Sequence, residues 1–257
     1  MGMIDAMPAD TLMRIDARLA DAFGPPPRWL YADPVDMLVL ALLSARTRDE
    51  DALAAFRVLR VRFPQWPALL DADPAVIERL IGRATWPDRK ARYLQDALSA
   101  LQAEQGRLTL DTLVGLSVED ASARLQRLPG VGPKTAASVL LFSRLRMRAL
   151  PVSTAYHRVV KRLGLISRRA SAEAVHRPLL AMLPLAWDVT RIERHHWLVA
   201  RLGKDICTKR RPQCARCPVE ALCPTRGRIL PSPARHGRQL ALPLPGPVIT
   251  GPAAAPP

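Results

Sequence analysis

The sequence contains no apolar run long enough to cross a bilayer. Its most apolar stretch, MLVLALLSA at residues 37–45, falls far short of the roughly 20 residues that a membrane-spanning helix needs. The first 23 residues, MGMIDAMPADTLMRIDARLADAF, place acidic side chains among the apolar ones and lack the apolar run of a signal peptide. We therefore expect a soluble, cytoplasmic protein without a membrane partner.

Cysteine is absent from the first 206 residues, and the four cysteines lie within 17 residues of one another: Cys207, Cys214, Cys217 and Cys223. In a cytoplasmic chain this clustering suggests a metal centre rather than disulfides. Four thiolates suit either tetrahedral zinc or a four-iron cluster, and the ligand chemistry alone does not choose between them. The spacing differs from the two close pairs usual for zinc, because only Cys214 and Cys217 form a close pair.

Lysine is scarce, with five residues among the 38 Lys and Arg: Lys90, Lys134, Lys161, Lys204 and Lys209. Against 23 acidic residues the formal net charge is +15 and the pI is about 11.0. Arginine therefore carries most of the positive charge, which is spread along the whole length. Such a field favours a polyanionic partner, although GC-rich coding is an alternative origin of the arginine excess.

Strand signals are absent, whereas helix signals recur. Asp33 and Asp73 each precede a proline as an N-cap acid, and Ser117 with Asp120 resembles a capping box. Residues 37–45 are apolar on every face, which indicates a central buried helix. The sequence predicts an all-α protein of one large or two small domains. Further helices are expected at 10–22, 49–62, 88–104, 134–146, 154–163, 171–182 and 188–202.

The composition changes near the C-terminus, where nine prolines occur in the last 34 residues among glycines and arginines. Such a segment buries too little apolar surface to offset the entropy of ordering it. We expect residues 226–257 to form a Pro-rich disordered tail, in which ALPLPGP is at most a weak polyproline ligand.

The stretch LPGVGPKTA, residues 128–136, joins two segments with helical periodicity. Its turn, Gly130, Val131 and Gly132, lets backbone amides point outward at the start of the second helix, where a phosphate is well accommodated. This pattern indicates a helix-hairpin-helix element that carries Lys134. An ordinary helical hairpin with glycines for turn geometry is the alternative.

The loop between the first two cysteines, TKRRPQ, contains Lys209, Arg210 and Arg211. A metal centre would hold this basic loop in place for a phosphate. These three residues are therefore candidate phosphate contacts.

Together these motifs resemble the endonuclease III family of helix-hairpin-helix DNA glycosylases, whose members carry a [4Fe-4S] cluster. The resemblance covers about residues 33–223. It rests on LLSARTRD at 42–49, LPGVGPKTA at 128–136, VSTAYHRVVKRLGL at 152–165, ERHHWLVARLGKDIC at 193–207, and the four cysteines at the family's spacing.

The resemblance implies two domains. A six-helix domain would comprise residues 33–149, with the helix-hairpin-helix motif at 117–146. Residues 1–32 and 150–225 would form a second helical domain that contains the cluster loop.

The resemblance also implies that Lys134 is the nucleophile. Its neutral amine would attack C1′ of the damaged nucleotide, expel the base and form a Schiff base that undergoes β-elimination. A basic environment lowers the proton affinity of such an amine. The family's catalytic aspartate corresponds here to Ser153, which can cap a helix but supplies no negative charge. The lost contribution is on the order of 10² to 10⁴ in rate, unless Asp49 supplies the carboxylate instead.

Arg46 stands where the family has a glutamine that probes the gap left by a flipped nucleotide. Its guanidinium could fill that gap, or it could be a neutral surface replacement. TWPDRKARYL, with Trp86, is either a DNA contact or a solvated helix start. His195 and His196 are expected to serve packing and hydrogen bonding rather than metal binding.

We therefore expect an endonuclease III-type base excision repair enzyme that acts as a monomer on double-stranded DNA with a damaged base or an abasic site. The chemistry expected is abasic-site cleavage, with weak or narrow glycosylase activity on oxidised pyrimidines. A non-catalytic DNA-damage binding protein of the same fold is one alternative. A zinc-stabilised helical DNA-binding regulator is another.

Overall fold

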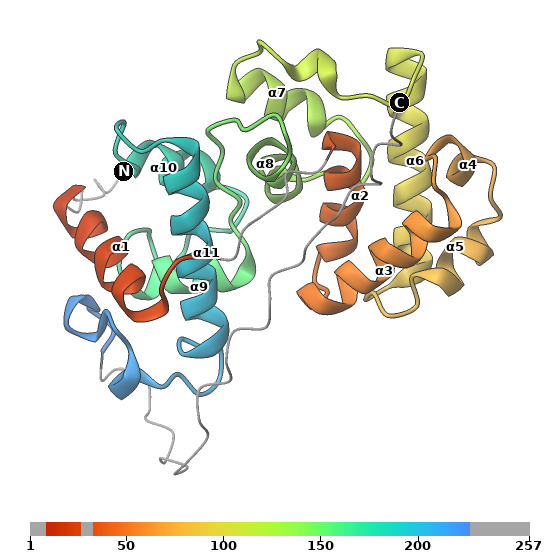
Figure 1. Ribbon diagram of the computed structural model, residues 1–257. Coiled ribbons are helices and arrows are strands. Elements are labelled where there is room, and N and C mark those ends of the chain that lie inside the picture. The colour runs from red at the N-terminus through yellow and green to blue at the C-terminus, as the bar shows by residue number, and fades with distance from the viewer. Residues whose placement is uncertain (1–8, 27–32, 227–257) are drawn as a thin grey trace, which may run out of the picture. The chain divides into compact units, whose positions relative to one another are not determined.

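The computed structural model describes residues 9–26 and 33–226 (Figure 1). The expected disordered tail, residues 226–257, lies outside the described residues except for Arg226. The described chain divides into two compact units, residues 33–149 and residues 9–26 with 150–226. Each unit is considered by itself below.

The described residues form helices and no strand, which confirms the all-α prediction. None of the helices in this part of the chain is long and apolar enough to cross a membrane. The elements are α1 (Ala9–Phe23), α2 (Pro34–Ser44), α3 (Asp49–Arg62), α4 (Pro67–Leu70), α5 (Pro74–Leu80), α6 (Pro87–Gln105), η1 (Asp111–Leu113), α7 (Val118–Leu125), α8 (Pro133–Phe142), α9 (Thr154–Arg162), α10 (His176–Met182), α11 (Val189–Asp205), η2 (Cys214–Arg216) and η3 (Glu220–Leu222).

Helix α2 is the central helix of the unit formed by residues 33–149. It packs against α3, α6 and α8 (Figure 1). Its side chains Leu38, Val39 and Leu43 are fully buried, as expected for a helix that is apolar on every face. Burial of each such side chain stabilises the fold by about 1.5–3 kcal/mol relative to exposure.

The predicted N-caps are confirmed. The Asp33 carboxylate accepts a hydrogen bond from the amide of Val35 at 2.8 Å, and Asp73 caps α5 in the same way. Ser117 Oγ accepts from the amide of Asp120 at 3.0 Å and donates to its carboxylate at 2.7 Å. These local bonds satisfy helix amides that have no partner within the helix.

Helix α8 ends at Phe142, four residues before the predicted end at 146, so that prediction was wrong. Ser143 is extended, with φ −92° and ψ 177°. Beyond it, the Arg144 guanidinium donates to Asp33 at 3.1 Å and also to Asp111. These long-range ion pairs favour an irregular segment over the helix that the local sequence permits.

Two other helices differ from the prediction at their ends. Helix α10 begins at His176 rather than at 171, because Ser171 Oγ accepts from the amide of Ala174 at 3.2 Å in a local turn. Helix α11 extends to Asp205 rather than to 202. An Arg201–Asp205 ion pair of 3.3 Å, spaced four residues apart, supports its last turn.

In the other unit, Asp16 connects α1 to α11. Its fully buried carboxylate lies 3.1 Å from His195 Nδ1 and accepts from Arg194 Nη2 at 2.8 Å. Burial alone would raise the pKa of Asp16, but these two partners more than offset burial and hold the pKa below its ordinary value. His195 Nε2 also lies 3.0 Å from the Tyr156 hydroxyl, which confirms the packing and hydrogen-bonding role expected of His195.

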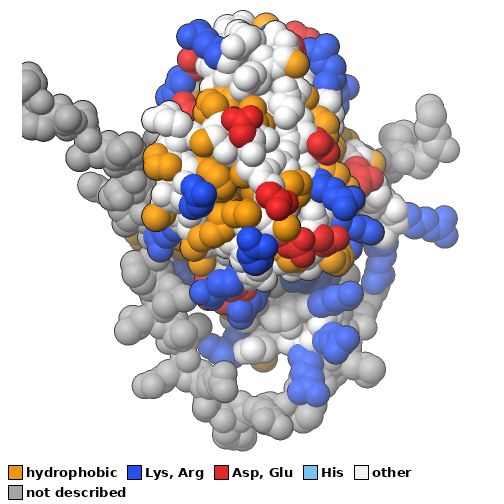
Figure 2. Space-filling view, turned by 90° about the vertical axis from the view of Figure 1, so that its right-hand side faces the viewer, with side chains coloured by type: hydrophobic (Ala, Val, Ile, Leu, Met, Phe, Trp, Pro, Cys, Tyr) orange, Lys and Arg blue, Asp and Glu red, His pale blue; other side chains and the backbone are white. Residues whose placement is uncertain are grey.

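One face of residues 33–149 mixes basic, acidic and hydrophobic side chains (Figure 2). Helix α3 has the same mixture, because it carries acids in its first turn and arginines in its last, and its Val61 is 82% exposed. The positive charge of the chain is therefore not gathered on this face.

Candidate active site

Helices α7 and α8 form a hairpin around the Gly130–Gly132 turn. Gly130 has φ +75°, and a Cβ at this position would lie 2.9 Å from Cγ of Tyr93. Glycine is therefore required both by the backbone conformation and by the close approach of Tyr93. The Val131 side chain is buried, so at this turn it can offer a ligand only its backbone.

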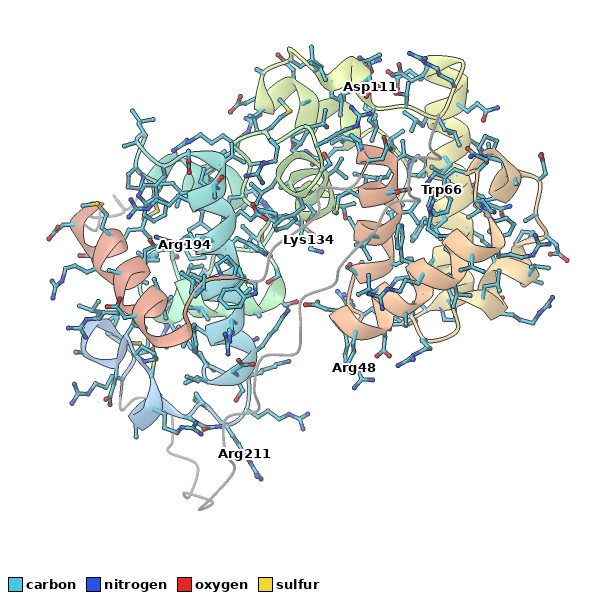
Figure 3. The ribbon with its side chains drawn as sticks, viewed as in Figure 1. Arg48, Trp66, Asp111, Lys134, Arg194 and Arg211 are labelled. Carbon is cyan, nitrogen blue, oxygen red and sulfur yellow. The ribbon has the colours of Figure 1, made fainter. Side chains whose placement is uncertain are left out.

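Lys134 is the second residue of α8, and Pro133 alone separates it from the glycine turn (Figure 3). The N-cap residue of α8 is Gly132, which makes no side-chain capping bond. Lys134 is half-buried, and its carbonyl accepts from Ser138 Oγ at 2.8 Å. The Lys134 amine and the backbone amides at the N-terminus of α8 thus belong to the same short segment.

Lys90 is a buried cation that the prediction did not include in the site. It is 4% exposed on α6, and its Nζ donates to the carbonyls of Leu43 and Ala45 and to Thr47 Oγ1. These bonds tie α6 to the end of α2 and the following turn. Burial, and then the charge of Lys134, lower the pKa of Lys90 to about 8. No local pattern distinguished this lysine from a solvated one.

Arg46 lies in that turn with φ 55°, a left-handed conformation uncommon outside glycine. Thr85 Oγ1 donates to the Arg46 carbonyl at 3.1 Å, and the Thr85 amide donates to Thr47 Oγ1 at 3.1 Å. The Arg46 guanidinium lies 5.3 Å from the ring centroid of Trp86, which is 46% exposed and has φ 54°. The fold thus brings together two residues that the sequence analysis treated separately. Arg46 was the candidate for filling the gap of a flipped nucleotide, and Trp86 was either a DNA contact or part of a solvated helix start.

Asp49 is the exposed first residue of α3, where a negative charge suits the helix dipole. The nearby Asp51 accepts from Arg48 Nε at 2.7 Å and from Arg83 Nη2 at 2.9 Å. The hydrogen bond from Arg48, followed by that from Arg83, outweighs desolvation and lowers the pKa of Asp51. This ion-pair network holds the start of α3 beside the segment that precedes α6.

Ser153 is the N-cap of α9. Its Oγ accepts from the amide of Tyr156 at 3.1 Å, which confirms the expected capping role. Lys134 and Ser153 belong to different compact units.

The cysteine segment follows α11 and is tied to α9 by arginines. Arg158 Nε donates to the Cys207 carbonyl at 2.8 Å. Arg162 Nη1 donates to Cys207 Sγ at 3.2 Å and to the Thr208 carbonyl at 2.7 Å. The basic loop that starts with Lys209 is exposed, and Arg211 projects outward from it (Figure 3).

The four cysteines are half-buried thiols. Burial raises the pKa of Cys214, and it raises that of Cys217 to about 11; the charges of the other cysteines add to both effects. The thiols therefore lie within electrostatic reach of one another. In the described part of the chain, no three His, Cys, Asp or Glu side chains are already arranged to hold one metal ion. A set of four thiols, with a guanidinium donating to one sulfur, nevertheless suits a thiolate-bound iron or zinc centre.

Comparison with known proteins identifies the family. Residues 39–184 match the family described as HhH-GPD superfamily base excision DNA repair protein. Endonuclease III of Synechocystis sp. is 30% identical over 196 residues, which are 76% of this chain and 83% of that protein. A DNA glycosylase homologue of Arabidopsis thaliana is 36% identical over 190 residues, or 72% of this chain and 64% of the relative. This chain spans about half, 54%, of chloroplastic endonuclease III homolog 1 from Arabidopsis thaliana, at 30% identity over 227 residues.

Solved structures show the same fold. A trapped covalent endonuclease III–DNA intermediate superimposes with a TM-score of 0.72 at 23% identity, covering 86% of this chain and 98% of that one. A thermostable thymine-DNA glycosylase gives a TM-score of 0.67 at 17% identity, covering 85% of this chain and 98% of that one. The hairpin, the fold and the sequence relatives agree: this chain belongs to the HhH-GPD superfamily of base excision DNA repair proteins and is of the endonuclease III type.

Proposed function

We propose that the protein cleaves double-stranded DNA at abasic sites, with Lys134 as the nucleophile. The observation that carries this proposal is the placement of Lys134 at the start of α8, shortly after the Gly130–Gly132 turn and within electrostatic reach of the buried Lys90. An amine in such a basic setting, beside amides suited to a phosphate, matches what Schiff-base chemistry on DNA requires.

The chemistry begins with the aldehyde that an abasic site presents in its open-chain form. The neutral amine of Lys134 adds to C1′, and loss of water forms an iminium ion. Removal of a proton from C2′ then allows the 3′ phosphate to leave by β-elimination, and hydrolysis of the imine returns the amine. The charge of Lys134 is one cause of the lowered pKa of Lys90, so the two amines lie within electrostatic reach of each other.

Base removal is proposed to be weak, or narrow in its range of oxidised pyrimidines. It needs stabilisation of positive charge on the sugar, and the Ser153 hydroxyl, which caps α9, carries no negative charge to supply it. Asp49, exposed at the start of α3, is the alternative source of a carboxylate.

The proposed DNA contacts fall into two groups. The backbone of Gly130, Val131 and Gly132 would bind a phosphate, and the exposed loop residues Lys209, Arg210 and Arg211 would bind others. Arg46, stacked on Trp86, would occupy the gap that a flipped nucleotide leaves.

A [4Fe-4S] cluster, held by Cys207, Cys214, Cys217 and Cys223, is the proposed cofactor, because four clustered thiols are its usual ligands. When bound, it would serve as a structural crosslink rather than as a reactant. Arg162 already connects α9 to this segment through Cys207 and Thr208, so the cluster would fix the loop that presents Lys209.

Borohydride trapping on a duplex with one abasic site tests the enzyme. We expect a covalent complex with the wild-type protein and none with Lys134→Ala. Lys134→Arg is the matched control, because it keeps a positive charge but forms no stable Schiff base. The absence of carboxylate at Ser153 favours one other function, a DNA-damage binding protein without turnover. Selective binding of the abasic duplex without trapping or strand cleavage by the wild-type protein would replace the enzyme with that binding protein.

A further inference from the structure

A pocket of about 380 Å³ opens along one face of α9, within the unit of residues 9–26 and 150–226. Its lining positions on α9 begin at Thr154 and recur three, four, seven and eight residues later, which is the spacing of one helical face. Six side chains of its lining are basic or imidazole groups: His157, Arg158, Lys161, Arg162, Arg168 and Lys209. Within the described chain, no Asp or Glu lines this pocket.

The two arginines nearest the cysteine segment form a fixed wall of the pocket. Arg158 donates to the Cys207 and Gly203 carbonyls, and Arg162 donates to those of Thr208 and Lys209. Carbonyl oxygens accept these bonds, and Cys207 Sγ accepts one more from Arg162 at 3.2 Å. No carboxylate pairs with either guanidinium among the described residues, unlike Arg83, which pairs with Asp51. The bonds also hold the backbone of Lys209 at the edge of the pocket.

A second contact holds the segment that contains Arg168, which also lines the pocket. His157 Nε2 lies 3.1 Å from the Ala170 carbonyl, which can only accept, so Nε2 carries the proton and donates. This bond fastens the segment after α9 back onto its face. Among the described residues, none accepts a hydrogen bond from the charged ends of Lys161, Arg168 or Lys209. The pocket lining therefore combines these three cationic groups with the two hydrogen-bonded guanidiniums of Arg158 and Arg162.

We propose that this pocket binds a phosphate group, and that the phosphate belongs to the DNA backbone, as a contact separate from the helix-hairpin-helix turn. Guanidinium, ammonium and the hydroxyl of Thr154 are the usual protein donors to phosphate oxygens. An open pocket suits a phosphodiester that continues into a chain on both sides. This assignment rests on the proposed DNA-binding function, and a free phosphate anion would use the same donors.

The salt dependence of DNA binding distinguishes a phosphate contact from a structural role. Each phosphate contact contributes about 0.9 to the slope of log K against log salt concentration on duplex DNA. The double variant Lys161→Gln/Arg168→Gln should lower the slope by up to about twice that value, on intact and abasic duplex alike. The matched control is Arg169→Gln/Arg177→Gln, which removes the same charge from exposed residues of the same unit that do not line the pocket. Its slope should change less, and circular dichroism should show equal folding of both variants.

A ³¹P NMR titration with inorganic phosphate, at constant ionic strength, tests the free anion. A smaller DNA salt slope in the pocket variant than in the control supports the proposal. Equal slopes, with phosphate binding lost only in the pocket variant, would assign the pocket to a free anion and overturn the DNA assignment. Equal slopes without phosphate binding would overturn the site altogether. If borohydride does not trap Lys134 on abasic DNA but the salt slopes of the pocket and control variants still differ, the proposed lyase chemistry is rejected and the phosphate contact at the pocket is retained.

Discussion

The Arg46 guanidinium lies 5.3 Å from the ring centroid of Trp86, and the backbones of both residues are left-handed, with φ 55° and 54°. A non-glycine residue in this conformation costs about 1–2 kcal/mol, so the surrounding contacts must hold it. Lys90 and Thr85 supply those contacts by binding the turn that contains Arg46. The pair is therefore presented to solvent in a predefined arrangement.

We expect Arg46→Ala to weaken binding to abasic duplex while leaving binding to intact duplex nearly unchanged, because only an extruded nucleotide opens a gap to fill. Trp86→Ala should have the same selectivity, and a double-mutant cycle should show coupling of about 0.5–1 kcal/mol. Fluorescence anisotropy with both duplexes measures these affinities. Arg46→Gly is the control for strain, because it should raise stability while losing the same affinity. Equal losses on both duplexes would reduce Arg46 to a general phosphate contact.

Ser153→Asp should raise base removal by roughly 10-fold or more while changing abasic cleavage less, because only base removal develops positive charge on the sugar. Ser153→Asn is the matched control, since it keeps a capping side chain without the charge. Single-turnover assays on thymine glycol and abasic duplexes separate the two steps. If Ser153→Asp has no effect while Asp49→Asn eliminates base removal, the carboxylate is supplied by Asp49.

Lys90 should make the free energy of unfolding depend on pH in the alkaline range. Its folded-state pKa is about 8 against an ordinary value of 10.5, because of burial and then the charge of Lys134. Between these values the unfolded chain binds more protons than the folded one, so stability rises as pH increases through this window. From about pH 7 to about pH 10 the wild-type protein should gain roughly 2 kcal/mol relative to Lys90→Met. Urea unfolding of both proteins across that range checks this, and parallel pH curves would contradict it.

Anaerobically purified protein should contain about four iron and four sulfide ions per chain, as a [4Fe-4S] centre requires. Cys217→Ser should lower both contents and destabilise the loop of Lys209, because the half-buried Cys217 is one of four proposed ligands. Elemental analysis with sulfide determination measures the centre independently of activity. A stoichiometric zinc content without iron would favour the zinc alternative.

The sequence by itself determined the features that depend on neighbouring residues. The caps at Asp33 and Ser117, the buried α2 and the hairpin turn at Gly130 all follow from short-range hydrogen bonding, helical periodicity and backbone sterics. The cap at Ser153 was predictable for the same reason, because it joins a hydroxyl to an amide three residues away.

Only the tertiary structure decided which distant residues meet. Lys90 binds a turn more than forty residues earlier in the chain, and Arg162 holds Lys209 at the edge of the α9 pocket. The early end of α8 likewise follows from Arg144 reaching Asp33. No local pattern specifies these pairs, because burial and electrostatic attraction depend on distance in space, and the packing of whole helices sets that distance.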